Sequence, residues 1–139
     1  MPTVDASVWV SAFDTKDRFH HESAAFLGRL TAAGTVAHAP TMVTLEVACA
    51  LSRRYADPAV WQRALDRLRV NPFLHLVPLD ENLLSESVRM GALNRLRAAD
   101  ALYAAAAGLE TGGVLVSWDN ELIERAGAVT PADWPSPRA

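Results

Sequence analysis

The stretch Gly113-Val114-Leu115-Val116-Ser117-Trp118-Asp119 indicates the class of fold, because a short apolar run ends there directly in an acid. A continuous apolar run of this length is typical of a strand that is buried on both faces, as in a parallel sheet. Thr3-Val4-Asp5 has the same form near the start of the chain, and a helix can begin at Ala6. Both stretches therefore predict a strand, an acid at its carboxyl end, and a helix that follows.

Similar strands alternate with helical sequence along the rest of the chain. Two more strand candidates lie at residues 35–39 and 73–79, and a fifth lies at residues 128–130. Helical sequence fills the segments between them, over residues 6–12, 17–30, 41–57, 58–69, 80–95, 97–110 and 121–126. This alternation predicts an α/β fold, a three-layer α/β/α domain with a mostly parallel five-stranded sheet.

The length of 139 residues suits one domain with a single core. We expect residues 1–139 to form that domain, with the Pro-rich residues 131–139 as a loosely held tail. Residues 1–13 lack the features of a signal peptide, and no apolar run approaches the roughly 20 residues that cross a bilayer. We therefore expect a cytoplasmic protein with no membrane partner. Cys49, the single cysteine, lies among apolar residues and is expected to be buried.

The charge balance excludes one way of binding nucleic acid. Thirteen basic and sixteen acidic residues give a net charge of −3. A chain with this charge does not coat nucleic acid or adhere to an acidic membrane by positive charge alone. A role with nucleic acid would require a local device, so the positions of the acids become the central question.

Four acids occupy positions where a solvated charge is unexpected. Asp5 and Asp119 follow strands, at the edge where parallel sheets collect ligands. Glu46 lies in the most apolar part of its helix, and Asp100 is the only charged residue within residues 98–109. Each has a purely structural alternative, as a helix cap, as a charge at the positive end of a helix, or as the partner of an arginine. Taken together, the four positions are better explained by one shared pocket than by four unrelated structural roles.

Four carboxylates share a pocket only when a cation compensates them. Two unit charges about 5 Å apart repel by roughly 3 kcal/mol even at an effective dielectric constant near 20. Mg²⁺ and Mn²⁺ prefer oxygen ligands and keep waters that can become nucleophiles. Two such ions roughly 4 Å apart would clamp a phosphodiester, one activating a water and the other stabilising the leaving oxygen. The acids therefore predict nuclease chemistry.

The segments around these acids are Thr3-Val4-Asp5-Ala6-Ser7, Leu45-Glu46-Val47, Leu96-Arg97-Ala98-Ala99-Asp100-Ala101-Leu102 and Val116-Ser117-Trp118-Asp119. They resemble the acidic motifs of PIN domains, and the resemblance spans nearly the whole chain. The size and minimal architecture are most similar to the VapC toxins of bacterial VapBC toxin–antitoxin systems. The resemblance implies a PIN fold and an endoribonuclease that hydrolyses RNA phosphodiester bonds with Mg²⁺ or Mn²⁺. It also implies a homodimer and a cognate VapB-type antitoxin that blocks the site.

By the same resemblance, the catalytic and metal-binding quartet is Asp5, Glu46, Asp100 and Asp119. Asp5 and Asp100 would be direct metal ligands, and the other two would act through a second metal or through water. A non-toxin PIN nuclease of RNA processing and a PIN-like binding module without catalysis are the alternatives. The complete quartet favours an enzyme.

Four further residues are candidates for supporting roles or for contacts with substrate. Ser7 and Ser117 keep hydroxyl groups near the first and last acid. Arg53 lies seven residues after Glu46 and hence on the same helical face, and Arg97 lies one turn before the third acid. Either arginine could meet a substrate phosphate or be an ordinary surface charge.

Overall fold

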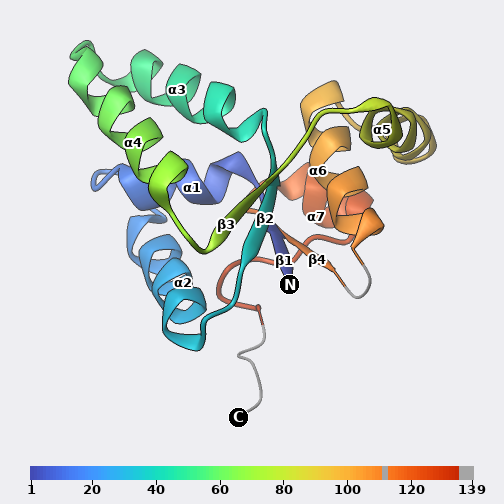
Figure 1. Cartoon of the computed structure of the whole chain (residues 1–139), viewed down its shortest axis with the longest axis horizontal. Helices are drawn as coiled ribbons and strands as arrows, with labels where there is room; N and C mark the ends of the chain where they lie inside the picture. The colour runs from blue at the N-terminus through green and yellow to red at the C-terminus, as the bar shows by residue number, and fades with distance from the viewer. Residues whose placement is uncertain (111–112, 135–139) are drawn as a thin grey trace.

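The computed structural model describes residues 1–110 and 113–134 (Figure 1). In these residues the strands are β1 (Pro2–Val4), β2 (Ala37–Pro40), β3 (Leu74–Val77) and β4 (Val114–Val116). The helices are α1 (Ala6–Phe13), α2 (His20–Ala33), α3 (Val43–Arg54), α4 (Pro58–Val70), α5 (Glu81–Asn94), α6 (Ala98–Leu109) and α7 (Asn120–Ala126). None of these helices is long and apolar enough to span a membrane.

The strands form one parallel sheet in the order β3-β2-β1-β4. The chain runs outward from β1 through β2 to β3 and then returns to place β4 on the other side of β1, with Thr3 paired to both His38 and Leu115. The strand order therefore reverses between β1 and β4. In open parallel sheets the carboxyl ends of the strands beside such a reversal frame the ligand crevice.

Helices cover both faces of this sheet, which confirms the predicted three-layer α/β/α fold. Figure 1 shows α1 to α4 on one side of the strands and α5 to α7 on the other. Several helix ends follow the sequence signals: Asp5 and Asp119 accept hydrogen bonds from backbone N–H groups in the first turns of α1 and α7. Gly34 adopts a left-handed backbone, φ 64°, where α2 ends.

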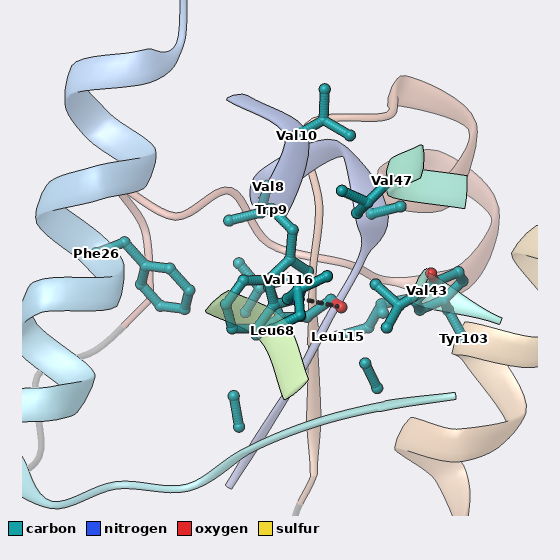
Figure 2. Packing of buried hydrophobic residues seen from close by; sticks show 14 of the residues in the cluster. Val8, Trp9, Val10, Phe26, Val43, Val47, Leu68, Tyr103, Leu115 and Val116 are labelled. Atoms are coloured by element: carbon teal, nitrogen blue, oxygen red, sulfur yellow. Dashed lines mark hydrogen bonds between the residues drawn. The ribbon is translucent and has the colours of Figure 1, made fainter. Parts of the chain in front are cut away.

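The core lies between the sheet and the helices α1 to α4 and continues to α6. Trp9, Phe26, Val47, Tyr103 and Val116 are among its buried members (Figure 2). The indole N–H of Trp9 donates to the carbonyl of Val4 at 3.2 Å, so this large ring is buried without an unpaired donor. Each fully buried aliphatic or aromatic side chain of this kind stabilises the fold by about 1.5–3 kcal/mol.

The expected fifth strand at residues 128–130 is reduced to one bridge, so the sheet has four strands rather than five. The N–H of Val129 donates to the carbonyl of Leu115 at 2.9 Å, and the N–H of Ser117 donates to the carbonyl of Val129 at 3.0 Å. Pro131 has no N–H with which to extend this ladder, and the chain turns there. Pairing therefore stops after a single residue.

The segment expected to be a loose tail begins with residues that pack on the domain. The carbonyl of Pro131 accepts a hydrogen bond from Arg29 at 3.0 Å. The ring of Trp134 packs against the core, with its centroid 6.4 Å from that of Phe26. Residues 131–134 therefore contact the domain where a loose tail was expected, and Trp134 covers apolar surface. Residues 135–139 lie outside the described residues.

Candidate acidic site

The four acids predicted from the sequence line one cavity of about 350 Å³. Two of them, Asp5 and Asp119, follow β1 and β4, the two strands beside the reversal of strand order. Glu46 comes from the first turn of α3 and Asp100 from the first turn of α6. Four segments that are distant in the sequence thus place one carboxylate each at the same edge of the sheet. The catalytic and metal-binding roles of these acids stay predictions.

Asp5 is the most enclosed of the four, with 5% of its surface exposed. Its Oδ2 accepts hydrogen bonds from the Ser7 hydroxyl at 2.7 Å, the Ser7 N–H at 3.3 Å and the Ser117 hydroxyl at 2.8 Å. Burial raises the pKa of Asp5 above its ordinary value, and the hydrogen bonds from both serines oppose that rise. Asp5 therefore caps α1 and also lines the acidic cavity, so its role as a helix cap does not exclude a role in the cavity.

Ser7 and Ser117 link the carboxyl ends of β1 and β4 through hydrogen bonds. The Ser7 hydroxyl donates to Asp5 and accepts from the N–H of Trp118 at 3.1 Å. The Ser117 hydroxyl donates to Asp5 and accepts from the N–H of Asp119 at 2.9 Å. Ser117 is completely buried, so it orients the acids rather than contacting a substrate. Ser7 is partly exposed and lines the cavity.

Arg97 bridges the carboxylates of Asp100 and Asp119. Its Nε donates to Asp100 Oδ2 at 3.1 Å and its Nη2 donates to Asp119 Oδ2 at 2.9 Å. Glu121 adds a third contact, with 3.4 Å between its Oε2 and Arg97 Nε. Burial raises the pKa of Asp100, Arg97 opposes this, and the negative charges of Asp119 and Asp5 raise it further. One arginine thus compensates part of the charge of four acids.

Glu46 has no such compensation. Its Oε1 is buried and has no hydrogen-bond partner within the described residues. Burial raises the pKa of Glu46; the nearby Tyr103 hydroxyl opposes this, and the charges of Asp5 and Asp100 add to it. None of the ion pairs within the described residues involves Glu46, so the alternative that it pairs with an arginine is not supported there.

The donor set fits a hard divalent cation. It consists of carboxylates, and one of them presents a buried oxygen that has no hydrogen-bond partner in the part of the chain that the structure describes. Carboxylate oxygens are the ligands that Mg²⁺ and Mn²⁺ prefer. Within residues 1–110 and 113–134, however, no three acidic, imidazole or thiol side chains are already arranged to hold one ion. Arg97 binds oxygens of two of the acids. Its N–H groups therefore compete with a cation for these oxygens.

A second cavity, of about 510 Å³, adjoins the acidic one and shares Ser7, Glu46 and Asp119 with it. Arg53, predicted from its spacing to Glu46, lines neither cavity, whereas its neighbour Arg54 lines the larger one. The residues of α3 that line this cavity are 46, 50 and 54, which are four positions apart and lie on one side of the helix. Arg53, seven positions after Glu46, does not line the cavity.

Other lining residues of this larger cavity were not predicted. They include Arg18 and Phe19, which were expected within a helix over residues 17–30 but lie in the loop before α2, which begins at His20. Trp118 directly precedes Asp119, and this position was the only sequence signal for it.

Comparisons with known proteins agree with this geometry. The family model described as the PIN domain matches residues 3–128. The fold is similar to that of the Sarcin-Ricin loop cleaving toxin VapC20 of Mycobacterium tuberculosis, with a TM-score of 0.71 and 19% identity over 100% of both chains. It is also similar to that of PAE2754 of Pyrobaculum aerophilum, with a TM-score of 0.64, 23% identity, and coverage of 94% of this chain and 89% of that one. No curated protein matches the sequence.

Proposed function

We infer the function from one premise: this chain belongs to the PIN-domain family. We propose that it is a Mg²⁺- or Mn²⁺-dependent endoribonuclease that hydrolyses RNA phosphodiester bonds at its acidic cavity. The observation that carries the proposal is the convergence of four carboxylates from four segments in one cavity beside the reversal of strand order. A single arginine bridges two of them, which leaves most of the negative charge for divalent cations to balance.

The four acids would divide the work according to their surroundings. Asp5, fixed by two serine hydroxyls, and Asp100 would be the direct ligands of a first ion. Glu46 and Asp119 would act through a second ion or through water. When bound, such ions would activate the attacking water and offset the charge that develops on the phosphodiester. The unpartnered Oε1 of Glu46 can accept a hydrogen bond from a water in the cavity and orient it.

We further propose that the chain is the toxin of a type II toxin–antitoxin system. It would act as a homodimer, meet its RNA in the cytoplasm, and be blocked by a cognate VapB-type antitoxin. The fold likeness to VapC20 supports this choice over a non-toxin PIN nuclease of RNA processing. The complete quartet supports catalysis over a PIN-like module that only binds.

The catalytic proposal is tested by RNA cleavage with purified chain, free of any antitoxin, in Mg²⁺ or Mn²⁺. Asp5→Asn and Asp100→Asn should each lower the cleavage rate by at least about 100-fold, as expected for a positioned catalytic group. Asp66→Asn is the matched control, because Asp66 is an exposed acid on α4. Circular dichroism would verify that each variant is folded. Cleavage by folded Asp5→Asn at the wild-type rate would refute the assignment.

The toxin proposal is tested separately, by induced expression in a bacterial host. Growth should stop with the wild-type chain and continue with Asp5→Asn. Co-expression of the small protein encoded in the neighbouring reading frame should restore growth. Growth unaffected by a chain that cleaves RNA in vitro would favour the non-toxin nuclease.

A further inference from the structure

The larger cavity continues from the acidic one and carries chemistry that the proposed cleavage does not use. It shares Ser7, Glu46 and Asp119 with the acidic cavity, so a chain molecule bound at the acids would extend into it. Its remaining wall presents an aromatic pair, Arg18, and the ion pair of Arg54 with Asp17. A positive group and aromatic rings beside a phosphodiester site are the two elements that bind single-stranded nucleic acid.

The aromatic pair consists of Phe19 and Trp118. Their rings are stacked, with centroids 4.0 Å apart and planes inclined by 6°, and the Arg18 guanidinium carbon lies 4.5 Å from the centroid of Phe19. Arg18 and Trp118 thus both lie against the Phe19 ring. Trp118, which is only partly buried and lines the cavity, is therefore the ring that we assign to a base contact.

Trp118 is held in a fixed position relative to the acids. Its indole N–H donates to the Ser23 hydroxyl at 2.8 Å, and its backbone N–H donates to the Ser7 hydroxyl at 3.1 Å. It is also the residue directly before Asp119. A base against this ring would accordingly lie one short step from the acidic cavity.

The loop that carries Arg18 is also held in place. Arg54 Nη1 donates to Asp14 Oδ2 and to Asp17 Oδ2, at 2.8 Å each, and the Tyr55 hydroxyl donates to Asp14. Asp17 in turn accepts from the N–H of Phe19 at 2.8 Å. The charge of Arg54 is therefore already compensated. Arg18 is exposed and forms no ion pair within the described residues, so it is the cation available to a ligand.

We propose that this larger cavity is a nucleotide subsite for single-stranded RNA, in which Arg18 binds a backbone phosphate and Trp118 contacts the adjoining base. The proposal rests on the proposed function, since the nucleotide is the one that flanks the bond cleaved at the acids. A base reaches an aromatic wall only when it is free of its helical stack, so loops and single strands fit and an intact duplex does not. The subsite is the local device that a chain of net charge −3 requires for RNA.

The phosphate contact is tested by binding in the Asp5→Asn background, where the RNA stays intact. The fluorescence anisotropy of a labelled single-stranded RNA would be measured over a range of salt concentrations. Arg18→Gln should weaken binding about five- to ten-fold and lower the slope of log K against log salt by about 0.7, the value for one phosphate contact on a single strand. Arg69→Gln, an exposed arginine on α4, is the control with the same charge change. Equal affinities and slopes for the two variants would overturn the proposal.

The base contact is tested with an RNA that lacks one base at the flanking position. The Asp5→Asn chain with Trp118 in place should lose about five-fold or more in affinity for this abasic RNA, since a base on an aromatic ring contributes at least that much. Trp118→Leu should bind the intact and the abasic RNA alike. If the substitution instead disturbed the folded structure, the affinities for both RNAs would fall and their ratio would stay the same. That result would count against the subsite. Thermal melting identifies a variant that does not fold. In that case the comparison of intact and abasic RNA on the Asp5→Asn chain decides alone, and equal affinities for the two RNAs would overturn the proposal.

These outcomes separate the subsite from the proposed function. Cleavage by the wild-type chain with an unchanged KM in Arg18→Gln would refute the subsite and leave the nuclease. Binding that depends on Arg18, without cleavage by the wild-type chain in Mg²⁺ or Mn²⁺, would refute the nuclease and leave the subsite.

Discussion

Replacement of Arg97 by glutamine should make the acidic cavity bind a divalent cation more tightly. Arg97 donates to Asp100 at 3.1 Å and to Asp119 at 2.9 Å, so it occupies oxygens that a cation between these acids would need. Arg97→Gln removes this competitor together with one positive charge. The local charge becomes more negative, which also favours a cation.

The size of the effect follows from the exposure of the arginine. The Arg97 side chain is 67% exposed, so each of its two ion pairs with the quartet contributes only about 0.2–1 kcal/mol. Loss of both pairs should therefore stabilise the cation complex by about 1 kcal/mol, which corresponds to a Kd about five-fold lower.

The assay is a calorimetric titration of Mn²⁺ into the metal-free chain near pH 7.5, without RNA. Arg89→Gln is the matched control, because Arg89 is 58% exposed and pairs with Glu86 on α5, away from the quartet. It should bind Mn²⁺ as the wild-type chain does. An affinity of Arg97→Gln that equals or falls below that of Arg89→Gln would refute the competition and indicate that Arg97 holds the acids in place for the cation.

Further predictions concern stability. Mg²⁺ or Mn²⁺ at about 100 times its Kd should stabilise the wild-type chain by about 2.7 kcal/mol, seen as a higher Tm near pH 7.5 that Asp100→Asn reduces; no rise would argue against a shared metal site. In the metal-free chain, Glu46→Gln should raise Tm at pH 7, because burial raises the pKa of Glu46 and its charged form destabilises the fold. In melts at decreasing pH, this gain in Tm should shrink as the Glu46 of the wild-type chain is protonated, and it should vanish below about pH 4.5. Burial alone would raise the pKa of Asp14, but the hydrogen bonds from Tyr55 and Arg54 outweigh burial and lower the pKa. Asp14→Asn should therefore be less stable than the wild-type chain at pH 7. This difference in stability should disappear as the pH falls below 3.8 and through the lowered pKa. Leu51→Ala should cost about 2–5 kcal/mol in denaturant unfolding, since Leu51 is 0% exposed, whereas Leu93→Ala, at a position 69% exposed, should change stability by less than about 0.5 kcal/mol.

The sequence predicted best those features that depend on neighbours along the chain. A strand buried on both faces leaves a continuous apolar run, and an acid directly after it is visible without knowledge of the fold, as at Asp5 and Asp119. The alternation of such runs with helical segments then requires a parallel sheet with helices on both faces, which the structure confirms.

Three positions have surroundings that differ from what the local sequence suggested, and each depends on how the elements pack. Cys49 has apolar neighbours and was expected to be buried, yet it is exposed, because it lies on the outer face of α3. Arg53 shares a nominal helical face with Glu46 but lines neither cavity. Trp134 attaches a segment whose proline content predicted a loose tail. In each case the deciding partner is distant in the sequence and leaves no local pattern.

The sequence by itself determined that Asp5 and Asp119 lie at one edge of the sheet, because parallel strands deliver their carboxyl ends to the same edge. Only the tertiary structure decided what surrounds them. The return of the chain from β3 to β4 places Ser117 against Asp5, 112 positions away, and brings Arg97 to Asp119, 22 positions away. The stack of Phe19 on Trp118 likewise joins a loop to a strand end. Contacts of this kind depend on strand order and helix docking, which no local run of residues encodes.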